Sequence, residues 1–436
     1  MQIQFTELMM EMSRVLDFVE TEQLGVQSNH GKRVAYLCAL LGEKAGLSKE
    51  ERLDLAAYAV LHDHALLHSL KVEEVPEILA TSQDREPNTP LIEALVQLET
   101  KGTDRNIIKH CVLGERNMVN FPFFHPQDHA ILYHHENADG SGPLGKTSKE
   151  INFYAALIHI ADLLDLLFAL KDAADDSWKN HPMLQPYVDS SKWKAIHAFV
   201  QDQTGKLFGE REATLFLDHV TVDVFDKLQD SQIESALPKL LKYKTIFLHP
   251  DQLIAMSALF AEIVDYKSTF TSKHSIGIAQ KAYRMAQYYG LSAEKQAELY
   301  FAGAVHDIGK LGVDLAILEK PDKLTLEEFE EMKKHALITY EVLSKIHGME
   351  EISKWAAYHH EKLNGNGYPF GYSAKDLGKY ERLMGCLDIY QALREDRPYK
   401  AGMTHEATMG ILRSMVVGGF IDEELTQDVD RVFADS

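Results

Sequence analysis

The chain has 436 residues, of which 45% are hydrophobic and 25% charged, and its formal net charge is −21. Because this length exceeds what one hydrophobic core accommodates, we expect two domains of about 200 residues each. The composition argues against large-scale disorder, and the acidic balance disfavours binding to a nucleic-acid polymer. Three scattered cysteines, Cys38, Cys111 and Cys386, have no CxxC spacing, which favours a reducing cytoplasm over a disulfide framework or a zinc ribbon.

The N-terminal segment contains acidic residues and no basic stretch, so we expect no signal peptide. The most apolar run, residues 151–170, includes His159, Asp162 and Asp165. We therefore interpret this run as a buried helix and not as a membrane span. Together these features predict a cytoplasmic protein that does not insert into a membrane.

Helical spacing of apolar residues recurs along the chain. It is found in residues 4–20, 34–41, 53–61, 151–170, 276–289 and 294–305. Helix starts are predicted at Ser48 and Ser292, and Thr325 with Glu328 forms a capping-box pattern. No alternating stretch is long enough to indicate a sheet. The sequence therefore predicts an all-α fold.

The chain also contains an internal repeat. The first two histidines of the pattern are 32 residues apart in both halves, and the third and fourth are 24 apart in both. The first half has 19 extra residues near Lys71–Glu93, which we interpret as a surface loop. We expect tandem domains at 1–230 and 231–436. The matched residues are His30, His62, Asp63, His110, His134, His135 and Asp162, and then His274, His306, Asp307, His335, His359, His360 and Asp388.

Imidazole and carboxylate groups are ligands for borderline divalent metal ions, and seven such donors with added waters suit two ions. Adjacent His306 and Asp307 would leave one helix about 100° apart, so they could serve neighbouring ions, with the carboxylate bridging them. Two ions a few ångströms apart clamp a hydroxide and a phosphoryl oxygen, the arrangement for attack at phosphorus. We interpret His249, His347 and His405, which lie outside the repeat, as packed or exposed residues.

An ordered set of motifs in the second half identifies a family resemblance. The motifs are His306-Asp-Ile-Gly-Lys310, Ile317-Leu-Glu-Lys-Pro321 with Leu324-Thr325, His335, His359-HEKLNGNGYP, Asp388-Ile-Tyr-Gln-Ala-Leu393 and Asp396-Arg-Pro-Tyr-Lys400. Over about residues 270–405 the chain resembles an HD-GYP domain, the cyclic-dinucleotide phosphodiesterase branch of the HD hydrolase superfamily.

The resemblance implies two divalent ions, usually iron or manganese, with nickel, cobalt, zinc or magnesium as alternatives. It implies that Asp307 bridges them, that His274, His306 and Asp388 complete one site, and that His335, His359 and His360 complete the other. A metal-activated water would then hydrolyse c-di-GMP, 3′,3′-cGAMP or both to linear dinucleotides such as pGpG or pApG, and in some members on to mononucleotides. Members with three metals carry a Glu where this chain has Phe270, so two ions are expected.

Three further groups are expected to handle the substrate. Lys310 lies four residues after His306, on the same face of one helix, and can neutralise charge on the phosphate. Arg397 and Lys400 resemble the family's phosphate-gripping pair, because the Arg fork suits a phosphate. Tyr368 of the GYP loop is expected to face the nucleotide.

The first half retains all seven ligand types but lacks the phosphate-handling groups. Leu66 stands where the second half has Lys310, and the loop His134-HENADGSGP lacks the tyrosine. We therefore expect a degenerate HD domain with a helper or regulatory role, in which the seven residues are candidates for a second metal site. Lys32 or Arg33 could supply the missing charge, in which case this half would be a second active site.

Two alternatives to the phosphodiesterase are a non-catalytic cyclic-dinucleotide receptor or scaffold and an HD hydrolase of another nucleotide. Lys310 and the complete ligand set of the second half favour an enzyme over a receptor, and the GYP loop favours a cyclic dinucleotide. The sequence does not separate c-di-GMP from cGAMP. As partners we expect the substrate, and we also consider a contact between the GYP loop and a GGDEF-domain protein, and a homodimer.

Overall fold

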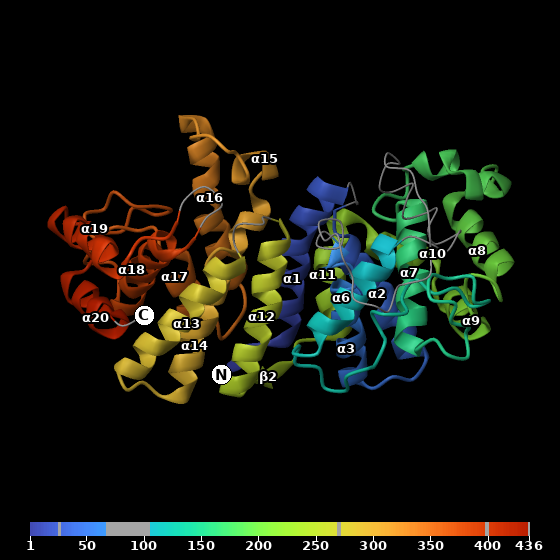
Figure 1. Ribbon diagram of the computed structural model, residues 1–436. Helices are drawn as coiled ribbons and strands as arrows, with labels where there is room; N and C mark the ends of the chain where they lie inside the picture. Colours follow the sequence, from blue (N-terminus) through green and yellow to red (C-terminus); the bar gives the residue numbers. More distant parts are fainter. Residues whose placement is uncertain (25–27, 67–104, 268–271, 397–400, 435–436) are drawn as a thin grey trace. The chain divides into compact units, whose positions relative to one another are not determined.

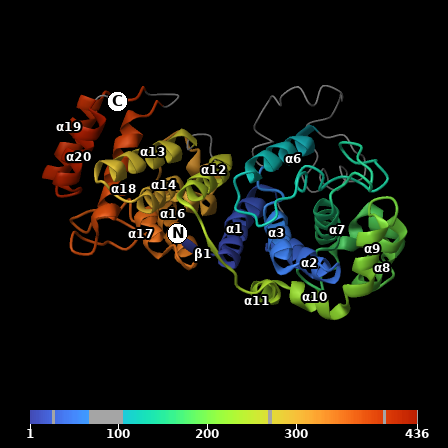
Figure 2. The same ribbon diagram turned by 90° about the horizontal axis from the view of Figure 1, so that it is seen from below.

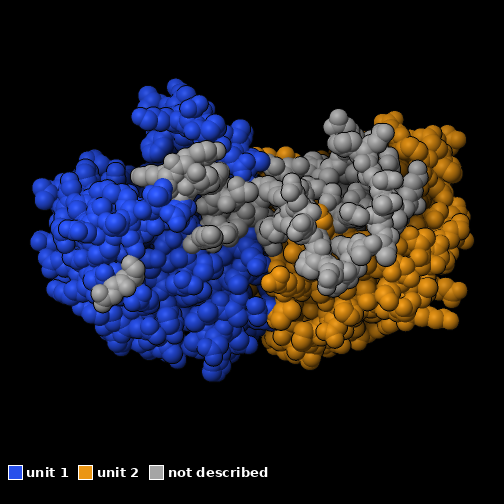
Figure 3. Space-filling model, in the orientation of Figure 1, with its two compact units in different colours: residues 1–4, 120–122, 245–436 blue, residues 5–119, 123–244 orange. Residues whose placement is uncertain are grey.

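The computed structural model describes residues 1–24, 28–66, 105–267, 272–396 and 401–434 (Figure 1). These residues are mostly helical, which confirms the predicted all-α fold. The chain divides into two compact units, which Figure 3 colours separately. We call residues 5–119 and 123–244 the first-half unit, and residues 1–4, 120–122 and 245–436 the second-half unit.

The first-half unit is built around α2, α3 and α7, whose apolar residues are almost fully buried. The capping box predicted at Ser48 is present, because the Ser48 hydroxyl accepts the Glu51 N–H and the Glu51 carboxylate accepts the Ser48 N–H. Its helices are α1 (Phe5–Val19), α2 (His30–Lys44), α3 (Lys49–Val60), α6 (Arg105–Met118), α7 (Phe153–Phe168), α8 (Lys192–Gln203), α9 (Glu210–His219), α10 (Val222–Leu228) and α11 (Asp230–Leu241), with a π-helical turn at Glu20–Leu24 and 3-10 turns at Ser177–Asn180 and Pro182–Tyr187.

In the second-half unit α13 and α14 lie side by side, and α12 packs against α14 (Figures 1 and 2). Thr325 and Glu328 form the predicted capping box at the start of α16. The elements of this unit are β1 (Gln2–Gln4), β2 (Thr245–Phe247), α12 (Pro250–Lys267), α13 (Ser272–Tyr288), α14 (Ala293–Val305), a 3-10 helix (Ile308–Gly312), α15 (Leu315–Leu318), α16 (Leu326–Leu343), α17 (Glu350–Ala357), α18 (Lys379–Arg394), α19 (His405–Val417) and α20 (Glu423–Phe433).

Two local features differ from the expectation. A short antiparallel sheet pairs β1 with β2, with Ile3 opposite Ile246, and its three-residue strands are too short to show alternation in the sequence. The prediction of a continuous helix from His306 to Lys310 is wrong, because α14 ends at Val305 and a 3-10 helix follows. A Cβ on Gly309 would collide with the backbone of α16, so this segment passes α16 more closely than a residue with a side chain could.

Residues 151–170 contain the buried helix α7, as predicted. Among the described residues no helix is both long enough and apolar enough to cross a bilayer. The loop expected near Lys71–Glu93 lies outside the described residues.

Candidate metal centre and active site

The seven second-half residues singled out by the repeat come from three helices and from the turns that follow two others. His306 caps the C-terminus of α14, Asp307 follows it, and His359 and His360 follow α17. The other three project from α13, α16 and α18 and are His274, His335 and Asp388. Their ligand atoms form three overlapping groups, each within 4.8 Å: His335 with His359 and His360, His274 with His306 and Asp388, and His306 with Asp307 and His359.

Asp307 lies among three of the imidazoles and turns a different oxygen toward each side. Its Oδ2 is 3.1 Å from Nε2 of His306, while its Oδ1 is 3.5 Å from Nε2 of His335 and 4.0 Å from Nε2 of His359. A carboxylate placed this way has the geometry to bridge two cations.

The backbone fixes the orientation of these three imidazoles. Nδ1 of His306, His335 and His359 donates to a backbone carbonyl at 2.8, 2.6 and 2.6 Å. The acceptors are Gly303, Met332 and Ala356. With Nδ1 protonated, the Nε2 lone pair of each neutral ring points into the cluster, as it does in metal-binding histidines. These buried Nε2 atoms have no hydrogen-bond partner among the described residues, so the donor set fits a metal ion.

The protonation states of His335, His359 and Asp307 also suit metal binding. Burial lowers the pKa of His335 to about 3 and lowers that of His359 as well, so both rings are neutral near pH 7. Burial alone would raise the pKa of Asp307, but His306 and Lys310 outweigh it and hold this pKa well below the usual range. Neutral imidazoles around an ionised carboxylate are the ligand forms that divalent ions require.

Both ring nitrogens of His274 lie within hydrogen-bonding distance of a carboxylate. Its Nε2 lies 3.0 Å from Oδ1 of Asp388 and its Nδ1 lies 3.2 Å from Oε2 of Glu395. Burial opposes the charged ring, yet the two carboxylates raise the pKa of His274 to about 9. Glu395 was not predicted from the sequence, because it lies seven residues beyond Asp388 and outside the repeated pattern.

The predicted substrate groups are placed only in part. The Lys310 ammonium lies 2.5 Å from Oδ2 of Asp307, and the Tyr368 ring lies 4.7 Å from the His360 ring. Arg397 and Lys400 lie outside the described residues, as does Phe270.

The loop that carries Tyr368 is organised by Glu361. The buried Glu361 carboxylate accepts hydrogen bonds from the N–H groups of Phe370, Gly371 and Tyr372. Gly367 packs so closely on the backbone of Glu361 that a Cβ there would collide with it. The acid after the two histidines therefore shapes the loop and does not itself face the metal cluster.

A cavity of about 260 Å³ opens beside the metal cluster. His359, His360 and Tyr368 form part of its wall, and the rest is largely apolar, including Phe329 and Phe420. Such a wall suits a flat aromatic ligand group next to the reacting centre.

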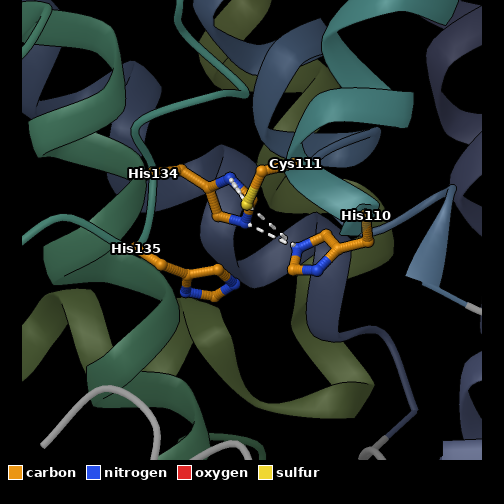
Figure 4. Close-up of side chains that lie close together, drawn as sticks. All are labelled: His110, Cys111, His134 and His135. Atoms are coloured by element: carbon orange, nitrogen blue, oxygen red, sulfur yellow. Dashed lines mark hydrogen bonds between the residues drawn. The ribbon is translucent and has the colours of Figure 1, made fainter. Parts of the chain in front are cut away.

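The first half gathers its seven counterparts in the same way. His30 Nε2 lies 3.1 Å from Asp162 Oδ1, and Asp63 Oδ1 lies 3.3 Å from His110 Nε2 and 3.6 Å from His134 Nε2. The ligand atoms of His30, His62 and Asp63 form one group, and those of His110, Cys111, His134 and His135 form another (Figure 4). Cys111 was not among the predicted ligands.

The two basic residues considered for this half are already engaged. Arg33 donates from Nε and Nη2 to the two oxygens of Asp165, at 2.6 and 2.9 Å, and Asp165 also holds Nδ1 of His30. Lys32 is buried and pairs with Glu234 at 2.7 Å. Both cations therefore neutralise protein carboxylates, and Leu66 is buried at 2% exposure.

Comparison with known proteins identifies a domain match and similar sequences. Residues 243–425 match the family model described as "HD domain". The chain is 29% identical to the 3'3'-cGAMP-specific phosphodiesterase 1 of Vibrio cholerae over 95% of this chain and 88% of that protein. It is 32% identical to a cyclic di-GMP phosphodiesterase of Thermotoga maritima over 41% of this chain and half of that protein.

A solved structure agrees in fold. A cyclic GMP-AMP specific phosphodiesterase of V. cholerae aligns over all of this chain and 99% of its own, with a TM-score of 0.59 at 20% identity. The second-half motifs, the family model and these relatives agree. Residues 243–425 therefore carry an HD domain, and the chain is similar to cyclic-dinucleotide phosphodiesterases.

Proposed function

We propose that the second-half unit hydrolyses one phosphodiester bond of a cyclic dinucleotide and releases a linear dinucleotide. The observation that carries this proposal is the position of Asp307, whose two oxygens face imidazole nitrogens that the backbone has oriented. The relatives are cyclic-dinucleotide phosphodiesterases, so a non-catalytic receptor is not favoured.

Two divalent ions, of iron or manganese, would be held by the seven second-half residues. When bound, such ions make a water more acidic and stabilise charge on the phosphoryl oxygens. His274, His306 and Asp388 would hold one ion and His335, His359 and His360 the other, as the grouping of their ligand atoms supports.

The remaining residues position the substrate and balance its charge. Lys310 is partly exposed beside Asp307, so its ammonium can reach a phosphate while it keeps the carboxylate ionised. Burial raises the pKa of Tyr368, so its hydroxyl stays protonated and can donate a hydrogen bond to the substrate. The cavity beside His360 would receive a nucleobase by stacking.

Of the two substrates, 3′,3′-cGAMP is favoured, because the relative that aligns over 95% of this chain is specific for it. We assign the catalytic role to residues 231–436 and a helper role to residues 1–230. A contact between the GYP loop and a GGDEF-domain protein, a homodimer and a cytoplasmic location remain predictions.

A substrate panel tests the proposal. The purified chain, loaded with Fe²⁺ or Mn²⁺, is incubated with 3′,3′-cGAMP, c-di-GMP, c-di-AMP and a linear dinucleotide, and the products are separated by chromatography. The account predicts metal-dependent cleavage of 3′,3′-cGAMP or c-di-GMP to pApG or pGpG. Binding of these compounds without cleavage would support the receptor instead.

A further inference from the structure

We propose that His110, Cys111, His134 and His135 form a closed metal site in the first-half unit, with one nitrogen from each imidazole and the Cys111 thiolate around a zinc-like divalent ion. Cys111 is the new element, since the second half has Ala336 at the matching position and no sulfur there. The proposal does not depend on the phosphodiesterase activity of the second half.

Two of the distances between the donor atoms match those around a tetrahedral ion. Nε2 of His110 lies 3.4 Å from Nε2 of His134, and the Cys111 sulfur lies 3.6 Å from Nε2 of His110. For metal–nitrogen bonds of about 2.0–2.1 Å and a metal–sulfur bond of about 2.3 Å, tetrahedral geometry places two nitrogens about 3.4 Å apart and a nitrogen and a sulfur about 3.6 Å apart. All four ligand atoms lie within 4.8 Å of one another.

The orientation of His134 supports the same site. Its Nδ1 donates to the backbone carbonyl of Ile131, so the Nε2 lone pair faces His110. Figure 4 shows the Cys111 sulfur and the three rings pointing toward one another. Two imidazole nitrogens and a sulfur that converge in a buried space satisfy each other poorly without a cation.

A buried carboxylate lies beside the proposed site. Asp63 is almost fully buried, and its Oδ1, 3.3 Å from Nε2 of His110, has no hydrogen-bond partner among the described residues. The groups nearest this carboxylate are the imidazoles of His62, His110 and His134, and a divalent ion held by such imidazoles would neutralise its buried charge.

The first-half cluster is more closed than its second-half counterpart. His135 is 3% exposed, whereas the side chain of His360 is 29% exposed, and buried Leu66 replaces the partly exposed Lys310. Structural zinc sites have all their ligands from protein, while catalytic sites keep a position open. We therefore assign this ion a structural role in stabilising the first-half unit.

The test uses the full chain with its second-half site disabled by Asp307→Ala and His335→Ala. The chain is stripped with a chelator and reloaded with Co²⁺, a spectroscopic substitute for zinc, and bound metal is counted by elemental analysis. The proposal predicts retained Co²⁺ and a thiolate-to-cobalt charge-transfer band. The band should disappear with Cys111→Ser and persist with Cys38→Ala, a control at another buried cysteine of the same unit.

Loss of all bound metal from the disabled chain would overturn the proposal, as would a charge-transfer band that survives Cys111→Ser. If Cys111→Ser fails to fold, the X-ray absorption spectrum of the zinc-loaded disabled chain decides. A sulfur neighbour at about 2.3 Å supports the site, and a shell of nitrogen and oxygen alone overturns it. Removal of zinc from this chain should also lower its Tm, and an unchanged Tm would contradict the structural role.

Discussion

The Lys310 ammonium lies 2.5 Å from Oδ2 of Asp307, so the carboxylate at the centre of the second-half cluster is paired with a cation before any substrate binds. The same lysine is 22% exposed and can contact a bound phosphate. The two residues are three apart in the sequence, and the segment that joins them is the turn after α14 and the start of the 3-10 helix.

Lys310→Met is expected to lower kcat by roughly 100-fold, the usual effect of removing one group that stabilises transition-state charge. The seven metal ligands are untouched, so metal content should stay at the wild-type value. Steady-state kinetics and elemental analysis of the same preparations measure both quantities. Lys354→Met, at an exposed lysine paired with Glu351, is the matched control and should change neither. Loss of metal from Lys310→Met would show that the lysine mainly stabilises the metal site.

Glu361→Ala removes the acceptor of three loop N–H groups and is expected to cost about 1–3 kcal/mol of unfolding free energy. Because the loop carries Tyr368, KM should rise more than kcat falls. Chemical denaturation and steady-state kinetics test the two effects.

The first half offers a matched control. Glu136 accepts the N–H groups of Leu144 and Lys146 in the equivalent loop, so Glu136→Ala should lower stability without raising KM. Equal increases in KM from the two variants would contradict the assignment of catalysis to the second half.

Gly367→Ala is expected to displace the GYP loop, because a Cβ at this position would collide with the backbone of Glu361. The predicted result is a fall in kcat/KM with metal content preserved. Gly410→Ala provides the comparison, since a Cβ at Gly410 would meet no atom within 4 Å. A Gly367→Ala enzyme with wild-type kcat/KM would mean that the loop does not contact the substrate.

Asp63→Ala should leave cyclic-dinucleotide cleavage by the folded chain largely intact, because Asp63 belongs to the first-half unit, in the group with His30 and His62. It should reduce metal content by lowering the occupancy of the site formed by that group. Circular dichroism establishes that the helices are retained before rates are compared. Complete loss of cleavage from a folded Asp63→Ala chain would make the first half catalytic or indispensable.

The sequence predicted the features that depend on local pattern or on the repeat. Apolar spacing located α2 and α14, the capping residues Ser48 and Thr325 began their helices, and the repeat selected residues that the fold brings together. Helix caps and amphipathic faces depend on residues close together in the sequence, so a single sequence predicts them.

Contacts between distant segments could not be predicted. Asp165 and Glu395 both hold Nδ1 of a cluster histidine, but they lie at different distances from the matched aspartates. Cys111 carries no local signal of metal binding, because its neighbours His134 and His135 come from another segment and no CxxC spacing marks them. The 3-10 helix after Val305 depends on close packing against α16, which the sequence of α14 does not encode.

The most direct test of the second-half assignment combines metal content with cleavage of 3′,3′-cGAMP and c-di-GMP, measured on the wild-type chain and on Asp307→Ala. Because Asp307 faces imidazoles from both groups, the account predicts that Asp307→Ala loses metal and that its cleavage rate falls to background. An Asp307→Ala chain that keeps the wild-type metal content and cleaves at the wild-type rate would contradict the account.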